Sequence, residues 1–200
     1  MFVQVFQAKA SDQGGLKKQM DRWVEEVRPV TTGYLGSTAG ITDDGDFIAI
    51  ARFESKEAAA QNSNRPEQSR WFEETSRYFK GAPTFHDCTD VQLWLGGGSD
   101  DAGFVQVIQG KVRDVDRMKE LIANSEADLR QNRTAVLGGL VAYHGDGGFT
   151  QAVYFTSENE AREQEKSRPA EADERIAELR SIAEGQPRYY DLRDPDLVSP

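Results

Sequence analysis

The chain has 200 residues, a net charge of −10 and a pI near 4.8, so it lacks the basic surface with which proteins bind nucleic-acid backbones. Neither half is basic: residues 1–100 hold 11 basic and 15 acidic residues, and residues 101–200 hold the remaining 13 and 19 of the 24 and 34. No apolar run of about 18 residues predicts a membrane span, and the single cysteine, Cys88, excludes an internal disulfide or a cysteine-rich zinc site.

The first stretch in chain order, Phe2–Lys9, alternates apolar side chains on both of its faces and predicts a covered strand. Because this strand begins at once, without a charged segment followed by an apolar one, we expect no secretory signal and a cytoplasmic protein. The stretch FVQVFQAK returns as FVQVIQGK at Phe104–Lys111, with six of eight positions identical and an offset of 102 residues. Such a repeat predicts a tandem duplication.

The same offset continues along both halves. It relates Leu35-Gly36 to Leu137-Gly138, Asp44-Gly45 to Asp146-Gly147, Phe53 to Phe155 and Ser55 to Ser157, and after a slip of one residue Arg65-Pro66 to Arg168-Pro169. We therefore expect two ferredoxin-like repeats, residues 1–95 and 104–193, joined by the glycine-rich linker 96–103 and followed by a surface tail, residues 194–200.

The first repeat reads as six elements. They are a strand at Phe2–Lys9, a helix at Asp12–Arg28, strands at Tyr34–Ile41 and Phe47–Phe53, a helix from Ser55 to about Phe79 that Pro66 interrupts, and a strand at about Thr84–Leu95. The second repeat gives the same order at 104–111, 114–131, 135–144, 148–155, 157–183 with a break at Pro169, and 187–193. This β-α-β-β-α-β order predicts an α+β fold, with a four-stranded antiparallel sheet and both helices on one face of it.

The helix-free face of each sheet is predicted to carry apolar side chains. Val3, Val5 and Gln7 in the first repeat match Val105, Val107 and Gln109 in the second. So much apolar surface is unfavourable in water, so we expect the two sheets to pack face to face in one pseudo-twofold α+β barrel.

These features resemble the dimeric α+β barrel superfamily, in its antibiotic-biosynthesis-monooxygenase-like branch. The resemblance rests on strand order and on a strand that ends in Phe, then a Ser-started helix with an Arg-Pro step: Phe53 to Arg65-Pro66, and Phe155 to Arg168-Pro169. In that family two chains form the barrel; the duplication suggests that one chain forms it alone, as a monomer or as a homodimer of such chains. Members include cofactor-independent monooxygenases and haem-degrading enzymes. The first-strand Asn of the haem-degrading branch falls on Gln7, and its Trp on Trp71, but the expected His has no counterpart.

Five residues are candidates for substrate binding in the expected chamber: Gln7, Gln109, Arg52, Tyr154 and Trp71. Gln7 and Gln109 either line the cavity or hydrogen-bond across the pseudo-twofold axis. Arg52 and Tyr154 are equivalent by the repeat, and Arg52 either holds an anionic group or lies on the surface at a strand end.

Other residues are predicted to be structural. Arg65 and Arg168 precede prolines at helix kinks, and Cys88 is expected to be a packed thiol. His86 and His144 lie in different repeats and form no metal triad. We predict no metal and no cofactor, with haem and flavin left open, and no catalytic residue is assigned.

Two functions follow. The chain is either an enzyme, a cofactor-independent oxygenase or isomerase acting on a small aromatic or polyketide-like molecule, or a non-catalytic barrel that binds a small ligand or assists assembly. A cavity of several hundred Å³ with clustered polar groups favours the first, and a filled interior favours the second.

Overall fold

A computed structural model describes residues 1–166 and 170–200. The chain forms two compact units, one of Met1–Thr89 with Asp194–Pro200 and the other of Asp90–Arg193. Arg168 and Pro169, which the sequence relates to Arg65 and Pro66, lie outside the described residues.

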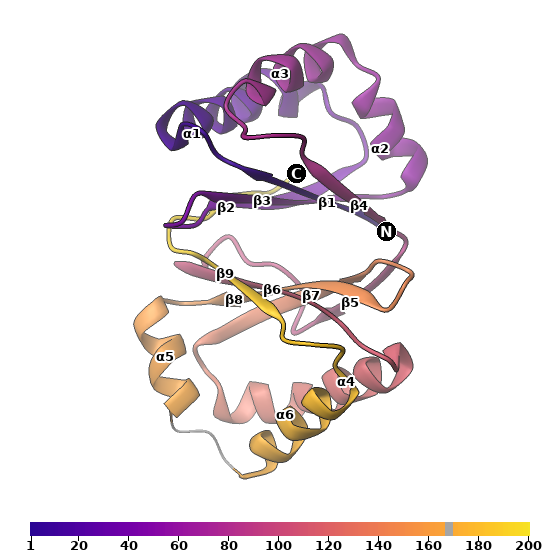
Figure 1. Ribbon diagram of the computed structural model, residues 1–200, viewed down its shortest axis with the longest axis vertical. Helices are drawn as coiled ribbons and strands as arrows, with labels where there is room; N and C mark the ends of the chain where they lie inside the picture. The colour runs from indigo at the N-terminus through magenta and orange to yellow at the C-terminus, as the bar shows by residue number, and fades with distance from the viewer. Residues whose placement is uncertain (167–169) are drawn as a thin grey trace. The chain divides into compact units, whose positions relative to one another are not determined.

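The first unit is an antiparallel sheet with helices on one face (Figure 1). Its elements are β1 (Phe2–Lys9), α1 (Gln13–Arg22), the π-helical turn η1 (Trp23–Val27), the 3-10 turn η2 (Arg28–Val30), β2 (Tyr34–Ile41), β3 (Asp46–Phe53), α2 (Lys56–Ser63), α3 (Pro66–Ser76), β4 (Thr84–Cys88) and β10 (Asp196–Val198). The strand order is β10-β2-β3-β1-β4.

The second unit repeats this arrangement. It contains β5 (Asp90–Trp94), β6 (Phe104–Lys111), α4 (Val115–Asn132), β7 (Val136–Tyr143), β8 (Gly148–Phe155), α5 (Glu158–Lys166), α6 (Ala170–Ile182) and β9 (Arg188–Leu192), in the strand order β5-β7-β8-β6-β9. The α+β class and the element order predicted from the sequence are confirmed in both units. The packing of the two sheets into one barrel stays a prediction.

Each sheet has five strands where four were predicted, and the extra strand of the second sheet arises because the stretch Thr84–Leu95 forms two strands instead of one. β4 pairs with β1 as far as Cys88 opposite Val3, and β1 itself begins at Phe2. With almost no partner left, the chain bends at Thr89, and β5 pairs with β7 of the second unit. Likewise the predicted surface tail contains β10, which pairs with β2 of the first unit. Each half thus provides the last strand of the other half's sheet.

Helix starts and strand irregularities recur at equivalent positions. Asp12 caps α1 by accepting a hydrogen bond from the Gly15 amide at 3.0 Å, and Asp114 caps α4 through the Arg117 amide at 2.9 Å. Ser55, where the sequence predicts a helix to start, caps α2 by accepting a hydrogen bond from the Ala58 amide at 3.2 Å. The β2–β3 ladder shifts register between Tyr34 and Gly36, where Gly36 has a φ of 107° that side chains rarely adopt.

Cross-strand pairing settles which face each side chain occupies. Gln4 pairs with Ala51 and Phe6 with Ala49, and these residues face the helices, whereas Val3, Val5 and Gln7 alternate to the other face. The core of the first unit lies on the helix side and is strongly aromatic: the rings of Phe6 and Phe47 lie 5.4 Å apart, and those of Phe6 and Phe79 lie 5.5 Å apart.

Candidate functional site

The first unit contains a hollow of about 140 Å³ between its sheet and its helices. Its floor comes from β1, β2, β3 and β10, its walls come from α1, η1, α2 and α3, and Phe85 of β4 lines one side. The polar side chains that line it are those of Gln4, Ser37, Asn62, Ser63, Gln68 and Asp196. All of these residues belong to the first unit.

Small side chains on the sheet floor make the space. Ala39 of β2 and Ala49 and Ala51 of β3 line the hollow. At the positions 102 residues later, the second unit has Val141, Gln151 and Val153. The strands β10 and β5 occupy equivalent places in the two sheets. Val198 of β10 pairs with Ser37, and Trp94 of β5 pairs with Gly139, which lies 102 residues after Ser37.

In the second unit the corresponding region is filled. The Trp94 indole lies against Gly139, and it packs in one cluster with Val141, Val153 and Phe155. Its indole nitrogen is buried with no hydrogen-bond partner among the described residues. The two units therefore differ at this end of the helix–sheet space: the first is open and the second is closed.

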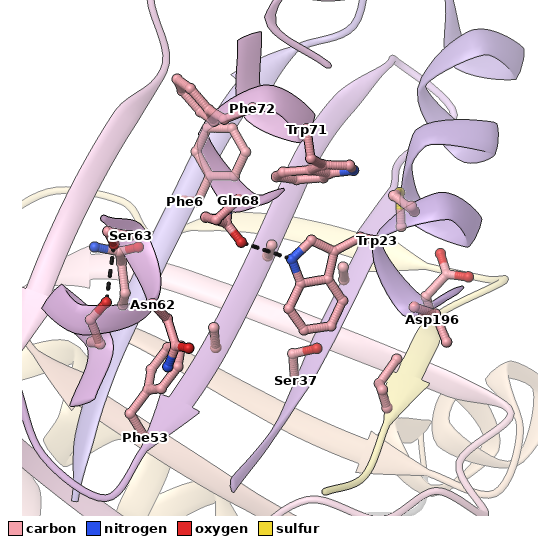
Figure 2. A pocket seen from close by; sticks show the side chains of 18 of the residues that line it. Phe6, Trp23, Ser37, Phe53, Asn62, Ser63, Gln68, Trp71, Phe72 and Asp196 are labelled. Atoms are coloured by element: carbon pink, nitrogen blue, oxygen red, sulfur yellow. Dashed lines mark hydrogen bonds between the residues drawn. The ribbon is translucent and has the colours of Figure 1, made fainter. Parts of the chain in front are cut away.

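Two indole rings form the walls of the open hollow (Figure 2). Trp23, the first residue of the π-helical turn, donates its indole N–H to Gln68 Oε1 at 3.0 Å, and Trp71 of α3 donates to the Gln19 carbonyl at 2.6 Å. π-helical turns are rare and often occur at functional sites. Both indole nitrogens are satisfied by the protein, so the rings present only their apolar faces and edges to a ligand.

Asp196 is the only carboxylate among the described residues that line this hollow. It is half-buried on β10, and no described residue donates a hydrogen bond to it. Burial raises the pKa of Asp196 above the ordinary value of 3.8, although the positive charge of Lys17 acts in the opposite direction. A carboxylate with a raised pKa and free oxygens beside an apolar space is suited to accept a proton.

The strand that carries Asp196 is held at several points. Lys17 pairs with Asp194, the Tyr34 hydroxyl donates to the Val198 carbonyl at 3.2 Å, and the Arg28 guanidinium donates twice to the Ser199 carbonyl, at 2.9 and 2.8 Å. This role was not predicted, because the three residues after Pro195 resemble a tail. The one usable signal was weak: Asp196-Leu197-Val198 shares a polar first residue and a central Leu with Gln92-Leu93-Trp94 of β5.

The structure separates the residues that the sequence nominated for one chamber. Trp71 lines the hollow, whereas Gln7 and Arg52 lie on the opposite face of the same sheet, where Gln7 pairs with Ile48 and Arg52 with Val3. Trp71 therefore does not share a site with Gln7 or Arg52.

Gln109 and Tyr154 share the helix-free face of the second unit's sheet. Gln109 Nε2 donates to Thr150 Oγ1 at 2.9 Å, and the same hydroxyl lies 2.9 Å from His144 Nε2. Thr150 has no exposed surface and Tyr154 has 1%. Their roles in binding stay predictions.

The remaining candidates have structural surroundings. Arg65 donates to Asn62 Oδ1 at 3.1 Å and to Thr32 Oγ1 at 3.3 Å, which ties the start of α3 to the loop before β2. Cys88 is buried. Among the side chains that the structure describes, no three of His, Cys, Asp or Glu gather closely enough to hold a metal ion, and no described helix is long and apolar enough to cross a membrane.

Comparison with known proteins identifies the fold. No protein-family model and no curated protein matches the sequence. Among solved structures, a presumed monooxygenase from Fusobacterium nucleatum is 12% identical, with a TM-score of 0.80 over 99% of this chain and 94% of its own. Another from Lactobacillus acidophilus is 12% identical, with a TM-score of 0.77 over 99% and 95%.

An anthrone oxidase-like protein is also similar, with 12% identity and a TM-score of 0.69 over 98% of this chain and 92% of its own. At these identities the likeness concerns the fold and not the reaction. The chain thus has the two-unit, ferredoxin-like α+β fold found in monooxygenase-like proteins, including relatives of the antibiotic-biosynthesis monooxygenases.

Proposed function

We propose that the first unit binds a small, electron-rich phenol in its hollow, and that Asp196 removes the phenolic proton so that O₂ oxidises the ring without a cofactor. The observation that carries this proposal is a half-buried carboxylate of raised pKa, free of hydrogen bonds from described residues, beside an apolar hollow. The monooxygenase-like fold supports the choice of an oxidation.

The volume of the hollow limits the ligand. An apolar cavity of about 150 Å³ holds benzene, and this hollow measures about 140 Å³. The buried part of the ligand is therefore one aromatic ring. Larger ring systems of the anthrone type do not fit without movement of Trp23 or of the helices. A resorcinol-type ring, with two hydroxyl groups in the 1,3 arrangement, is small enough for the hollow and is electron-rich enough to react with O₂ as a phenolate.

The reaction balances with O₂ as the only co-reactant. Asp196 takes the phenolic proton, and the ring carbon opposite that oxygen forms a C–O bond to O₂. The Asp196 proton passes to the outer oxygen and gives a hydroperoxide. Loss of the ring C–H proton and cleavage of the O–O bond then release water and leave a carbonyl. One oxygen atom enters the ring, the other becomes water, and the substrate supplies all four electrons. For resorcinol the product is a hydroxyquinone.

The protein's part in this scheme is to hold the ring and to move one proton. A phenol has a pKa near 10 and an ordinary aspartate one near 4, so transfer in water is unfavourable. Raising the pKa of Asp196 narrows this gap. The apolar walls of Trp23 and Trp71 exclude water from the ring.

Oxygen uptake with resorcinol tests the proposal. We expect consumption of O₂ with formation of a quinone absorbance by the wild type, and a loss of at least 100-fold in Asp196→Asn. Asp44→Asn, which removes an exposed carboxylate in the β2–β3 turn, serves as the control and should react as the wild type does. Saturable binding of resorcinol with no O₂ uptake would instead favour the non-catalytic ligand binder, and absence of binding would contradict both.

A further inference from the structure

The second unit has its own hollow, larger and more polar than the first. It measures about 790 Å³ and lies between the sheet at β6, β8 and β9 and the helices α4, α5 and α6. The two hollows share lining positions that the repeat relates, such as Gln4 and Gln106, but the first extends toward β10 and β2 and the second extends toward β9.

Residue sizes explain why the second unit has more space at this end than the first. Ile108 lies 102 residues after Phe6, and Ala183 corresponds to Phe79, because Phe79 bridges to Ala10 and Ala183 bridges to Val112. In the first unit the Phe6 and Phe79 rings pack together, 5.5 Å apart. Replacing two packed phenyl rings by an isoleucine and an alanine leaves room for a ligand. The smaller side chains of Ile108 and Ala183 therefore account for the extra space in the second unit.

Two glutamine amides lie on the floor. Ile108 pairs with Gln151 across β6 and β8, so Gln106, two residues earlier on the same face, is a diagonal neighbour of Gln151. Gln106 is 7% exposed and donates Nε2 to Asp191 Oδ1 at 2.9 Å, while its carbonyl oxygen accepts no hydrogen bond from a described residue. The Gln151 amide likewise has no hydrogen bond within the described part of the chain, and its counterpart in the first unit is Ala49.

At the inner end of the hollow, carboxylates outnumber the cationic side chain that they surround. Arg162 pairs with Asp191, with Glu158 at 3.4 Å and with Glu165 at 3.3 Å. A cation already surrounded by three carboxylates offers little attraction to an anionic ligand. The inner end of the hollow therefore favours a neutral molecule that uses hydrogen bonds.

The helix side opposite the glutamines is apolar, with Met118 of α4 and Ile176 and Leu179 of α6 lining the hollow. An apolar roof over a floor with free amides suits a flat molecule with polar edges. A volume of about 790 Å³ lies within the range of roughly 300–1,000 Å³ for sites of drug-sized ligands. Several fused rings fit, whereas a single ring would be held loosely.

We propose that this hollow is a second ligand site, distinct from that of the first unit, which binds a neutral fused-ring heteroaromatic compound whose carbonyl and N–H groups pair with the amides of Gln106 and Gln151. Each amide offers a carbonyl acceptor, and Gln151 also offers its N–H donors. Burying these groups without partners is unfavourable, which gives selectivity for a ligand with a matching edge.

Lumichrome is the probe, because it is flat, has three fused rings, is neutral near pH 7 and carries alternating carbonyl and N–H groups on one edge. We expect its fluorescence to titrate saturably with one molecule bound per chain. Its 1,3-dimethyl derivative, which has the same rings without the N–H donors, should bind at least 10-fold more weakly. Equal affinity for the two compounds would refute the amide pairing.

Three variants locate the site. Ala183→Phe restores the first unit's ring and should abolish binding, and Gln151→Leu should weaken it at least 10-fold with the fold intact by circular dichroism. Ala51→Val, which narrows the other hollow, should leave lumichrome binding unchanged, and resorcinol should not compete. The proposal is overturned if lumichrome does not bind the wild type, if both second-unit variants bind it as tightly as the wild type, or if resorcinol displaces it.

Discussion

Asp196 pairs with Ala39 across strands β10 and β2, so the carboxylate of the hollow stands beside a side chain that is only a methyl group. At the equivalent pair in the second unit, Gln92 stands opposite Val141, and the Gln92 amide is satisfied by the Tyr143 hydroxyl at 3.0 Å and the Lys119 carbonyl at 3.0 Å. One position thus holds a hydrogen-bonded amide in one unit and, in the other, a carboxylate that accepts no hydrogen bond from a described residue. This asymmetry favours specialisation of the first unit.

The raised pKa of Asp196 predicts a pH-dependent cost in stability. Its folded-state pKa exceeds the unfolded value of about 3.9. At pH values between these two pKa values, the native protein therefore binds more protons than the unfolded chain. Stability therefore falls as the pH rises from near 4 through the folded-state pKa and stays lower above it. Asp196→Asn cannot ionise and escapes this loss. We expect its Tm at pH 7 to exceed that of the wild type by roughly 1–4 °C, with the difference shrinking near pH 3.

Thermal melts at both pH values measure this difference, with Asp44→Asn as the exposed-carboxylate control. An Asp196→Asn protein that melts at or below the wild-type temperature at pH 7 would contradict the assigned environment of the carboxylate.

The alanine floor predicts a second outcome. Ala39→Val with Ala51→Val introduces the second unit's residues and fills the hollow with methyl groups. We expect resorcinol affinity, measured by calorimetry, to fall at least 10-fold while the Tm stays within a few degrees of wild type. Ala161→Val is the contrast, because Ala161 is 1% exposed in a filled cluster. Overpacking there should destabilise the protein by about 1–3 kcal/mol. Similar loss of stability in both cases would mean that the floor has no spare room.

Local sequence patterns predicted most of the fold, because each strand and helix carries its own periodicity, cap or breaker. Asp12 and Ser55 cap where helices begin, and Pro66 begins α3. The exchange of β5 and β10 was not predictable in this way. Whether Cys88 is followed by a continued strand or by a bend depends on where its partner β1 begins, and that is a property of the pairing rather than of either segment alone.

The site was predicted less well, for a related reason. Trp71 was nominated and lines the hollow, but Asp196 comes from a segment distant in sequence and was missed. The duplication favoured the nomination of residues that both halves share, such as Gln7 and Gln109, as binding residues. The open hollows arise where the halves differ, as at Ala39 and Val141 or at Phe79 and Ala183.

The hydrogen bond between Trp23 and Gln68 predicts a third outcome. Trp23 lies on a π-helical turn and is fixed across the hollow by its indole N–H to Gln68 Oε1, at 3.0 Å. Gln68→Leu removes this bond, worth about 0.5–1.5 kcal/mol, and lets the ring turn. We expect resorcinol to bind about 2–10-fold more weakly. Gln61→Leu on the exposed face of α2 is the matched control and should bind as the wild type does. Unchanged binding in Gln68→Leu would show that Trp23 is positioned by packing alone.

The attachment of β10 predicts the last outcome. Arg28 lies in the first unit's 3-10 turn, yet its guanidinium donates twice to the carbonyl of Ser199, beyond the strand that carries Asp196. Arg28→Gln shortens the donor and removes its charge, so the end of β10 should open more often. We expect faster amide hydrogen exchange over Asp196–Val198 and a 2–10-fold drop in O₂ uptake with resorcinol, because the base is held less firmly. Arg77→Gln, at an exposed pair with Glu73 on α3, should change neither quantity. If exchange in β10 accelerates while O₂ uptake is unaffected, Asp196 does not act as the base, since a proton acceptor must stay within hydrogen-bond reach of its substrate.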